Sequence, residues 1–235
     1  MLSYGERNQD INGYLKINWY FKVSKGRPVP RLNREESQAR TRDLLVQAAR
    51  DEIVRKGFAQ ATVRDIADAA GFSQGAFYSN FPSKEAILLE VVRRHQTEER
   101  AKIEAVLGHA PGRAADAMKG IERWAATINA DPGWAILAVE LQLQALRSPS
   151  FALGYNALNR EHFEALGALI SRLFDLLGKA VPGDPVEVAA GFIALGRGMA
   201  LLSQQGDAGR IGRIVVTFLK AVIASAKSLR AENEV

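Results

Sequence analysis

The chain has 235 residues, of which 47% are hydrophobic and 24% charged, and its formal net charge is +5. These values predict a soluble globular protein with one large domain or two small ones. The chain contains no cysteine, which excludes disulfides, thiolate metal sites and cysteine nucleophiles. The sequence has no apolar run long enough to predict a membrane span, and its first residues lack the apolar core of a signal peptide. We therefore expect a cytoplasmic protein without a membrane partner.

Residues 1–33 predict an N-terminal extension that is poorly ordered. Residues 15–19 alternate like a short strand, but the sequence offers no partner strand. Positive charge gathers in this extension and at the start of the first expected helix, and it includes Arg27, Arg31 and Arg42. Such a basic run is either a solvated tail or an arm that lies near phosphates or in a minor groove.

Helical periodicity dominates from residue 34 onward and predicts an all-α protein with about nine helices. Pro and Gly clusters separate the longer apolar helices of the C-terminal half. The expected helices span 34–56, a short stretch after Thr62, 74–80, 84–107, 112–130, 133–147, 151–178, 185–205 and 209–229.

Residues 62–81 have the spacing of a helix-turn-helix. Thr62 and Asp65 are placed as a capping box for a short helix that Gly71 ends, and Ser73 can cap the next helix. A second helix of this kind fits the major groove of DNA. We expect Phe72 and Phe77 to pack inward on the scaffold. The outer face then consists of Gln74, Gly75, Ala76, Tyr78, Ser79 and Asn80.

Several of these side chains have chemistry that suits DNA. Gln and Asn amides can read adenine edges, and Gly75 and Ala76 permit a close approach of the backbone. The Tyr78 phenol can reach a phosphate, and Lys84 begins a helix whose backbone N–H groups also favour phosphate.

Residues 48–88 resemble the DNA-binding domain of the TetR family of bacterial transcriptional regulators. The matching residues are Ala48, Ala49, Lys56, Gly57, Phe58, Thr62, Val63, Asp65, Ile66, Ala67, Ala70, Gly71, Gly75, Phe77, Tyr78, Phe81, Ser83, Lys84 and Glu85. The sequence departs from the family at Ile53, where Phe is usual, at Ala76, where Thr is common, and at Asn80, where His or Arg is frequent. Ala76 therefore lacks the phosphate or base contact that a Thr hydroxyl would make.

The resemblance implies three N-terminal helices for DNA binding and about six more for ligand binding and dimerisation. We expect a helix-turn-helix domain over 34–82, a family domain over about 38–98, and an effector-binding and dimerisation domain over 99–235. The complete DNA-binding set is Arg42, Thr62, Val63, Ser73, Gln74, Gly75, Ala76, Phe77, Tyr78, Ser79, Asn80, Phe81 and Lys84.

The C-terminal half has two further candidate sites that the resemblance implies. The effector is expected to be a largely apolar small molecule in a pocket among Trp124, Trp134, Leu137, Glu140, Leu141, Gln144, Phe151, Tyr155, Asn159, His162, Phe163, Phe192 and Met199, although aromatic residues at this spacing are often plain core. The dimer interface is expected to use the last two helices through Phe192, Leu195, Gly196, Met199, Leu202, Ile211, Val215, Phe218 and Val222.

These expectations lead to a homodimeric repressor that a small-molecule effector releases from a palindromic DNA operator. A transcriptional activator is a variant of the same hypothesis. Two other classes stay open: an interaction protein that binds DNA without sequence preference, and an all-α enzyme acting on a hydrophobic molecule. The sequence contains no catalytic motif, and His95, His109 and His162 lack metal-ligand spacing, so we expect neither an enzyme nor a metal or other cofactor.

Overall fold

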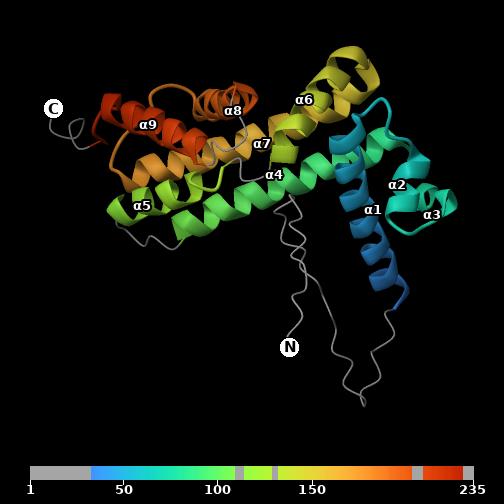
Figure 1. The fold of residues 1–235 in the computed structure, drawn as a ribbon. Helices are drawn as coiled ribbons and strands as arrows, with labels where there is room; N and C mark the ends of the chain where they lie inside the picture. Colours follow the sequence, from blue (N-terminus) through green and yellow to red (C-terminus); the bar gives the residue numbers. More distant parts are fainter. Residues whose placement is uncertain (1–32, 109–113, 129–131, 203–208, 230–235) are drawn as a thin grey trace, which may run out of the picture.

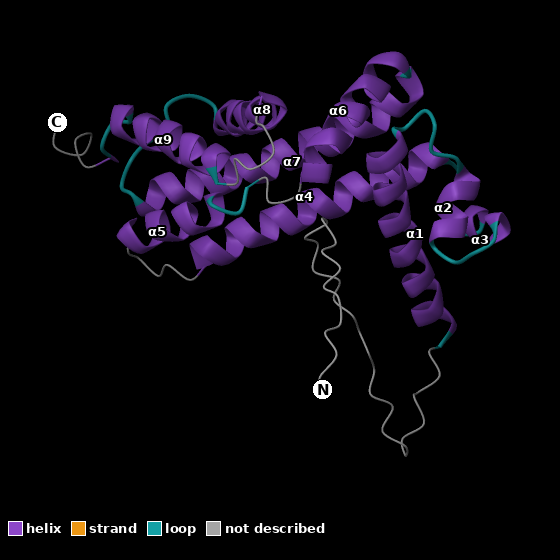
Figure 2. Cartoon of the chain, in the orientation of Figure 1, coloured by secondary structure: helices purple, strands orange, loops and turns teal. Residues whose placement is uncertain are grey.

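The structure is a computed structural model that describes residues 33–108, 114–128, 132–202 and 209–229. Within these ranges the chain forms nine helices and no strand, which confirms the all-α prediction (Figure 2). The predicted extension over 1–33, with Arg27 and Arg31, lies outside the described residues. The helices are α1 (Arg34–Lys56), α2 (Val63–Ala69), α3 (Gln74–Tyr78), α4 (Lys84–Gly108), α5 (Ala114–Ala125), α6 (Pro132–Arg147), α7 (Pro149–Leu176), α8 (Pro185–Leu202) and α9 (Arg210–Ser225).

Helices α1 to α3 form one end of the molecule, and the long helix α4 runs from them to the opposite end (Figure 1). There α4 packs against α5 and α7, while α8 and α9 lie over α7 and α5 respectively. Helix α6 lies between the two ends and contacts α1, α7 and α8. Both α4 and α6 therefore connect the N-terminal helices with the C-terminal bundle.

Side-chain caps explain where the N-terminal helices begin. Thr62 accepts the backbone N–H of Asp65 at 3.1 Å, and the Asp65 carboxylate accepts the N–H of Thr62 at 2.9 Å, which completes the predicted capping box. Asn33 forms a second capping box with Glu36 at the start of α1. Gly57 ends α1 with φ of +80°, a backbone conformation that glycine adopts without a Cβ penalty.

Helix α9 is shorter than the periodicity suggests. Helix α9 ends at Ser225 rather than at residue 229. The Lys179 ammonium donates to the carbonyls of Ile223 at 2.7 Å and Ala226 at 3.2 Å, which satisfies acceptors that the next helical turn would have used. Gly212 in α9 lies against α5 so closely that a Cβ would overlap the backbone carbonyl of Ala125.

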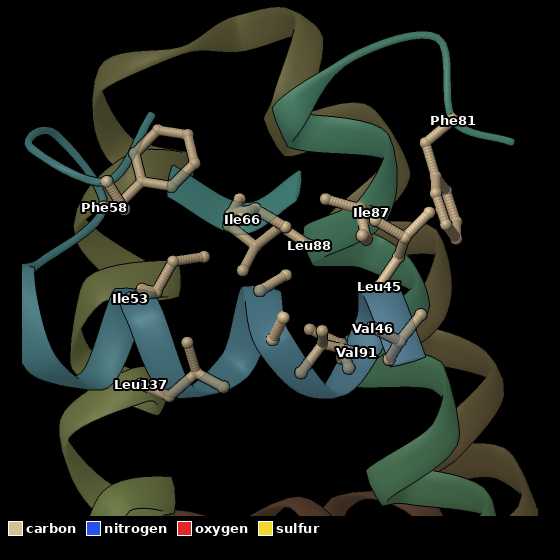
Figure 3. Close-up of a cluster of buried hydrophobic side chains, with 14 of the residues drawn as sticks. Leu45, Val46, Ile53, Phe58, Ile66, Phe81, Ile87, Leu88, Val91 and Leu137 are labelled. Carbon is tan, nitrogen blue, oxygen red and sulfur yellow. The ribbon is translucent and has the colours of Figure 1, made fainter. Parts of the chain in front are cut away.

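The main hydrophobic core is shared by the N-terminal helices, α6 and the start of α7. Leu45 and Ile53 of α1, together with Ile66 of α2 and Leu88 of α4, pack in one cluster with Leu137 of α6 (Figure 3). The same cluster also contains Leu141, Phe151 and Tyr155. A second cluster at the far end of the bundle contains Leu107, Ala117, Ile121, Leu173 and Leu219. Helix α1 thus packs directly on α6, and the N-terminal helices share one core with α6 and the start of α7.

Candidate functional site

The short helix α3 is held at its start by a side-chain cap and below by one buried ring. Gly71 adopts φ of +78° in the turn, and the Ser73 hydroxyl accepts the N–H of Ala76 at 3.2 Å. Phe77 is fully buried, while Phe72 is half-buried and packs against the same core. The prediction that both rings face the scaffold is therefore confirmed, and the opposite side of α3 is left to solvent.

Three residues dominate the exposed side of α3. Gln74 and Gly75 are exposed, and the side chain of Tyr78 is 56% exposed. The Gln74 amide has no hydrogen bond to another described residue, whereas the exposed Ser79 hydroxyl donates to the Gly75 carbonyl at 2.9 Å. Gln74 and Tyr78 therefore present polar groups that a partner could bind without breaking protein contacts.

Other members of the predicted DNA-binding set are used within the protein. Phe77 and Phe81 are buried, so their rings belong to the core beneath α3. Asn80 is half-buried and donates its amide to the Ala76 carbonyl at 2.8 Å, which occupies a group that was expected to read a base. Thr62 donates its hydroxyl to Asp65 at 2.7 Å, and Val63 packs against the core.

Arg42 and Lys84 brace the helix-turn-helix from two sides. Arg42 donates to the Asn80 carbonyl at 2.5 Å, and its guanidinium lies 4.1 Å from the centre of the Phe81 ring. The Lys84 ammonium donates to the carbonyls of Phe58 at 2.6 Å and Ala61 at 2.9 Å. Burial lowers the pKa of Lys84, and two of its three donor positions are occupied, so its ammonium supports the turn between α1 and α2.

Glu140 of α6 reaches the same turn from the C-terminal bundle. Its carboxylate accepts the backbone N–H of Phe58 at 3.2 Å, so α6 binds the N–H of Phe58 while Lys84 of α4 binds its carbonyl. Glu140 was expected in the effector pocket, but its carboxylate points toward the helix-turn-helix. Periodicity gives no sign of such a contact, because the two residues are 82 positions apart.

A cavity of about 600 Å³ lies among helices α4 to α9. Its walls consist mostly of aliphatic side chains, which include Ile103, Leu169 and Ile193. Among the predicted effector residues, Trp124, Trp134, His162 and Phe192 line this cavity. Its size falls in the range of roughly 300–1,000 Å³ that is usual for small-molecule pockets.

The remaining predicted effector residues lie elsewhere. Leu137, Leu141, Phe151 and Tyr155 are buried in the core shared with the helix-turn-helix. Asn159 contacts the cavity only indirectly, because its side chain accepts the amide of the lining residue Gln96 at 3.1 Å. Gln144, Phe163 and Met199 are half-buried outside the lining. Arg197 lines the cavity and was not predicted, since a single Arg in an apolar helix has no local signature.

Two lining residues carry buried polar atoms without partners. Among the described residues only three buried side-chain polar atoms lack a hydrogen bond: Asn80 Oδ1, Trp124 Nε1 and His162 Nδ1. Two of the three therefore belong to the cavity. Burial, together with the charges of Arg100 and Arg197, lowers the pKa of His162 to about 4, so the imidazole is neutral at physiological pH.

The outer surface of α8 and α9 is unusually apolar. Leu202 is 79% exposed and Phe218 is 53% exposed, while the predicted interface residues Phe192, Leu195, Gly196, Met199 and Val222 are half-buried. Ile211 and Val215 are buried inside the bundle, which removes them from the predicted contact surface. Helix α8 is also the one described helix with the length and apolarity of a membrane span, a test of length and composition that core helices of other proteins also pass.

The N-terminal helices are similar in sequence to known proteins. Residues 45–91 match the family model described as bacterial regulatory proteins, tetR family. A 55-residue segment is 46% identical to the HTH-type transcriptional repressor KstR2 of Mycolicibacterium smegmatis and covers 23% of this chain and 27% of that protein. A 67-residue segment is 39% identical to the uncharacterized HTH-type transcriptional regulator YdgC of Bacillus subtilis, covering 28% and 34%. The matches thus span about a quarter to a third of these relatives.

Solved structures extend the likeness over most of the chain. The fatty acid degradation regulator FadR of Bacillus halodurans superposes with a TM-score of 0.65 at 18% identity and covers 80% of this chain and 97% of its own. A transcriptional regulator from Rhodococcus sp. Rha1 gives 0.62 at 21% identity, covering 79% and 97%. A Saccharomonospora viridis protein in complex with choline gives 0.59 at 22% identity, covering 78% and 96%. At these identities the likeness establishes the fold.

Proposed function

We propose that this chain, which belongs to the TetR family of bacterial regulators, is a homodimeric transcriptional repressor that an effector releases from its DNA operator. The observation that carries the proposal is the surface of α3. Gln74 and Tyr78 are exposed on a helix whose other side is fixed by the buried Phe77. A short, rigidly held helix with free polar groups is what recognition in a major groove requires.

On DNA, Gln74 would read a base edge and Tyr78 would bind a phosphate. The amide of Gln can bind adenine through two hydrogen bonds, and the phenol adds reach without charge. Gly75 lets the backbone of α3 approach the groove. Arg42 and Lys84 act as positioning residues in this proposal, because their charged groups already bind backbone carbonyls of the domain.

Dimerisation would cover the apolar surface of α8 and α9. Only Ala189 is buried along α8, although the helix is largely apolar. Gly191 and Gly198 have open space where a Cβ would lie, which allows a second helix to approach closely. Two copies joined there would present two α3 helices to half-sites about 34 Å apart on a near-palindromic operator in the cytoplasm.

The effector would bind in the cavity and act through α6 as well as α4. Trp134, Ala138 and Gln142 of α6 line the cavity, whereas Leu137 and Glu140 on the same helix contact the helix-turn-helix. A ligand that shifts α6 therefore also shifts the contact with Phe58. Such a ligand can release DNA only to the extent that it binds the non-binding arrangement of the dimer more tightly.

The test is fluorescence anisotropy with the intergenic DNA upstream of the coding sequence and a scrambled duplex of equal length, at about 0.15 M salt. Tight binding to the first duplex alone by two protomers supports a specific regulator. Equal, weak and steeply salt-dependent binding to duplexes recovered from a genome-wide selection would favour an interaction protein without sequence preference. Turnover of a cavity-bound molecule would favour the enzyme.

A further inference from the structure

The cavity among α4 to α9 contains a polar end, which limits the chemistry of its ligand. The following inference rests on the proposed effector function and concerns the ligand class. His162 is 8% exposed, and its Nδ1 has no partner among the described residues. The buried indole N–H of Trp124 also lacks an acceptor, but Trp124 packs against the second cluster, which contains Leu107 and Leu173. A buried polar atom without a partner is unfavourable, so a ligand that supplies the missing hydrogen bond gains affinity in addition to its apolar contacts.

The charges around this polar end are predominantly positive. Arg197 lines the cavity from α8, and the charges of Arg197 and Arg100 both act on His162. Glu161 approaches Arg100 at 3.9 Å, whereas Arg197 has no carboxylate within ion-pair distance among the described residues. A half-buried guanidinium without a counter-charge is a strong binding group for a planar anion.

Acidic residues also line the cavity, but they lie along α4. Glu99 is bound to Lys102 at 2.6 Å, which neutralises that pair. Glu98 is exposed, so solvent screens its charge. The charges that lower the pKa of His162 are those of Arg100 and Arg197. The excess positive charge at the His162 end is therefore not cancelled by the acidic residues of α4.

We propose that the cavity binds an amphipathic carboxylate, with its anionic group at Arg197 and its apolar body along the aliphatic walls. The neutral imidazole of His162 supplies an uncharged hydrogen bond at the polar end. Leu166, Leu169 and Ile170 of α7 provide an apolar track that starts one turn from His162. A quaternary ammonium ligand would place a cation beside Arg197 and is disfavoured by the same geometry.

The proposal is tested by isothermal titration of the full chain with three probes of equal length: dodecanoate, 1-dodecanol and dodecyltrimethylammonium, each below its micelle concentration. We expect dodecanoate to bind roughly tenfold to hundredfold more tightly than the alcohol, as a charge-assisted hydrogen bond to Arg197 requires. Arg197→Gln should abolish this preference, and Arg197→Lys should retain much of it.

The matched control is Arg172→Gln, which removes an exposed Arg of α7 outside the cavity and should leave all three affinities unchanged. Thermal unfolding of each variant separates a lost contact from a lost fold. Equal affinity for the alcohol, tighter binding of the ammonium, no binding of any probe, or an unchanged preference in Arg197→Gln would each overturn the proposal. These titrations contain no DNA, so they test the ligand class independently of operator binding. Failure to bind an operator would count against the repressor function alone.

Discussion

The carboxylate of Glu140 accepts the backbone N–H of Phe58 at 3.2 Å, across 82 residues of sequence. This hydrogen bond joins α6 to the turn that sets the angle between α1 and α2. Phe58 is buried, so the N–H has little access to water if Glu140 is removed. The bond is therefore both a stabilising contact and a route from the bundle to the helix-turn-helix.

Glu140→Ala should lower the free energy of unfolding by about 1–3 kcal/mol, because it leaves a buried N–H without an acceptor. It should also weaken operator binding, since the α1–α2 turn is less firmly held. Urea denaturation and anisotropy measure the two effects. Glu164→Ala is the control, because Glu164 is an exposed residue of α7. Equal stability of both variants would show that Phe58 N–H finds another acceptor.

Gln74→Ala should weaken operator binding roughly tenfold to hundredfold without changing stability, because one bidentate base contact is worth about 1–3 kcal/mol. The loss should vanish on a scrambled duplex. Gln60→Ala, which removes an exposed amide from the loop before α2, serves as the control. Anisotropy on both duplexes is the measurement. Unchanged affinity of Gln74→Ala would place the reading surface elsewhere.

Lys84→Met should destabilise the fold and leave the salt dependence of DNA binding almost unchanged. Its ammonium donates to two carbonyls and lies 4.1 Å from the centre of the Phe58 ring. We expect a loss of about 2 kcal/mol in urea denaturation. A phosphate contact would instead reduce the slope of log affinity against log salt by about 1. A reduced slope with normal stability would restore Lys84 to the DNA-binding set.

Acidification should destabilise the protein through His162. Its pKa is about 4 in the fold, lowered from 6.5 by burial and by Arg100 and Arg197. The unfolded chain binds a proton near the ordinary pKa, so stability is complete above that value and falls as the pH drops toward the folded pKa. Between about pH 7 and pH 5 the loss attributable to His162 is about 2 kcal/mol.

Urea denaturation at the two pH values, repeated with His162→Gln, measures this contribution. The variant should lose about 2 kcal/mol less than the parent on acidification, because Gln binds no proton in either state. Other groups titrate equally in both proteins and cancel in the comparison. Identical losses would mean that the imidazole is accessible to protons in the folded state.

Phe218→Glu should convert the proposed dimer into monomers, because it places a charge on an apolar surface that a partner would cover. Light scattering coupled to size-exclusion chromatography measures the change in mass. Leu153→Glu is the control, since Leu153 of α7 is 77% exposed and lies outside α8 and α9. A dimeric Phe218→Glu variant would move the interface away from α9.

The features that could be predicted from the sequence are those that residues close together in the chain determine. The capping pair Thr62 and Asp65 and the turn at Gly71 depend on contacts within a few positions, and the inward side of Phe77 follows from the local pattern of polar and apolar residues; each is confirmed. The contacts of Lys84 and Glu140 could not be predicted, because their acceptors and donors come from a distant turn. The same limit explains why Leu137 and Tyr155 were expected in a pocket although they lie in the shared core.

The shared core also bears on the construction of chimeric biosensors. A fusion that joins residues 1–98 to a foreign sensing domain would separate Leu88 and Val91 from Leu137 and Leu141, which pack in the same cluster. The fused protein would then expose apolar surface at the junction unless the new domain supplied a matching helix. A DNA-binding segment transferred to another protein should therefore include α6 and the first turns of α7, which follow far behind the helix-turn-helix in the chain.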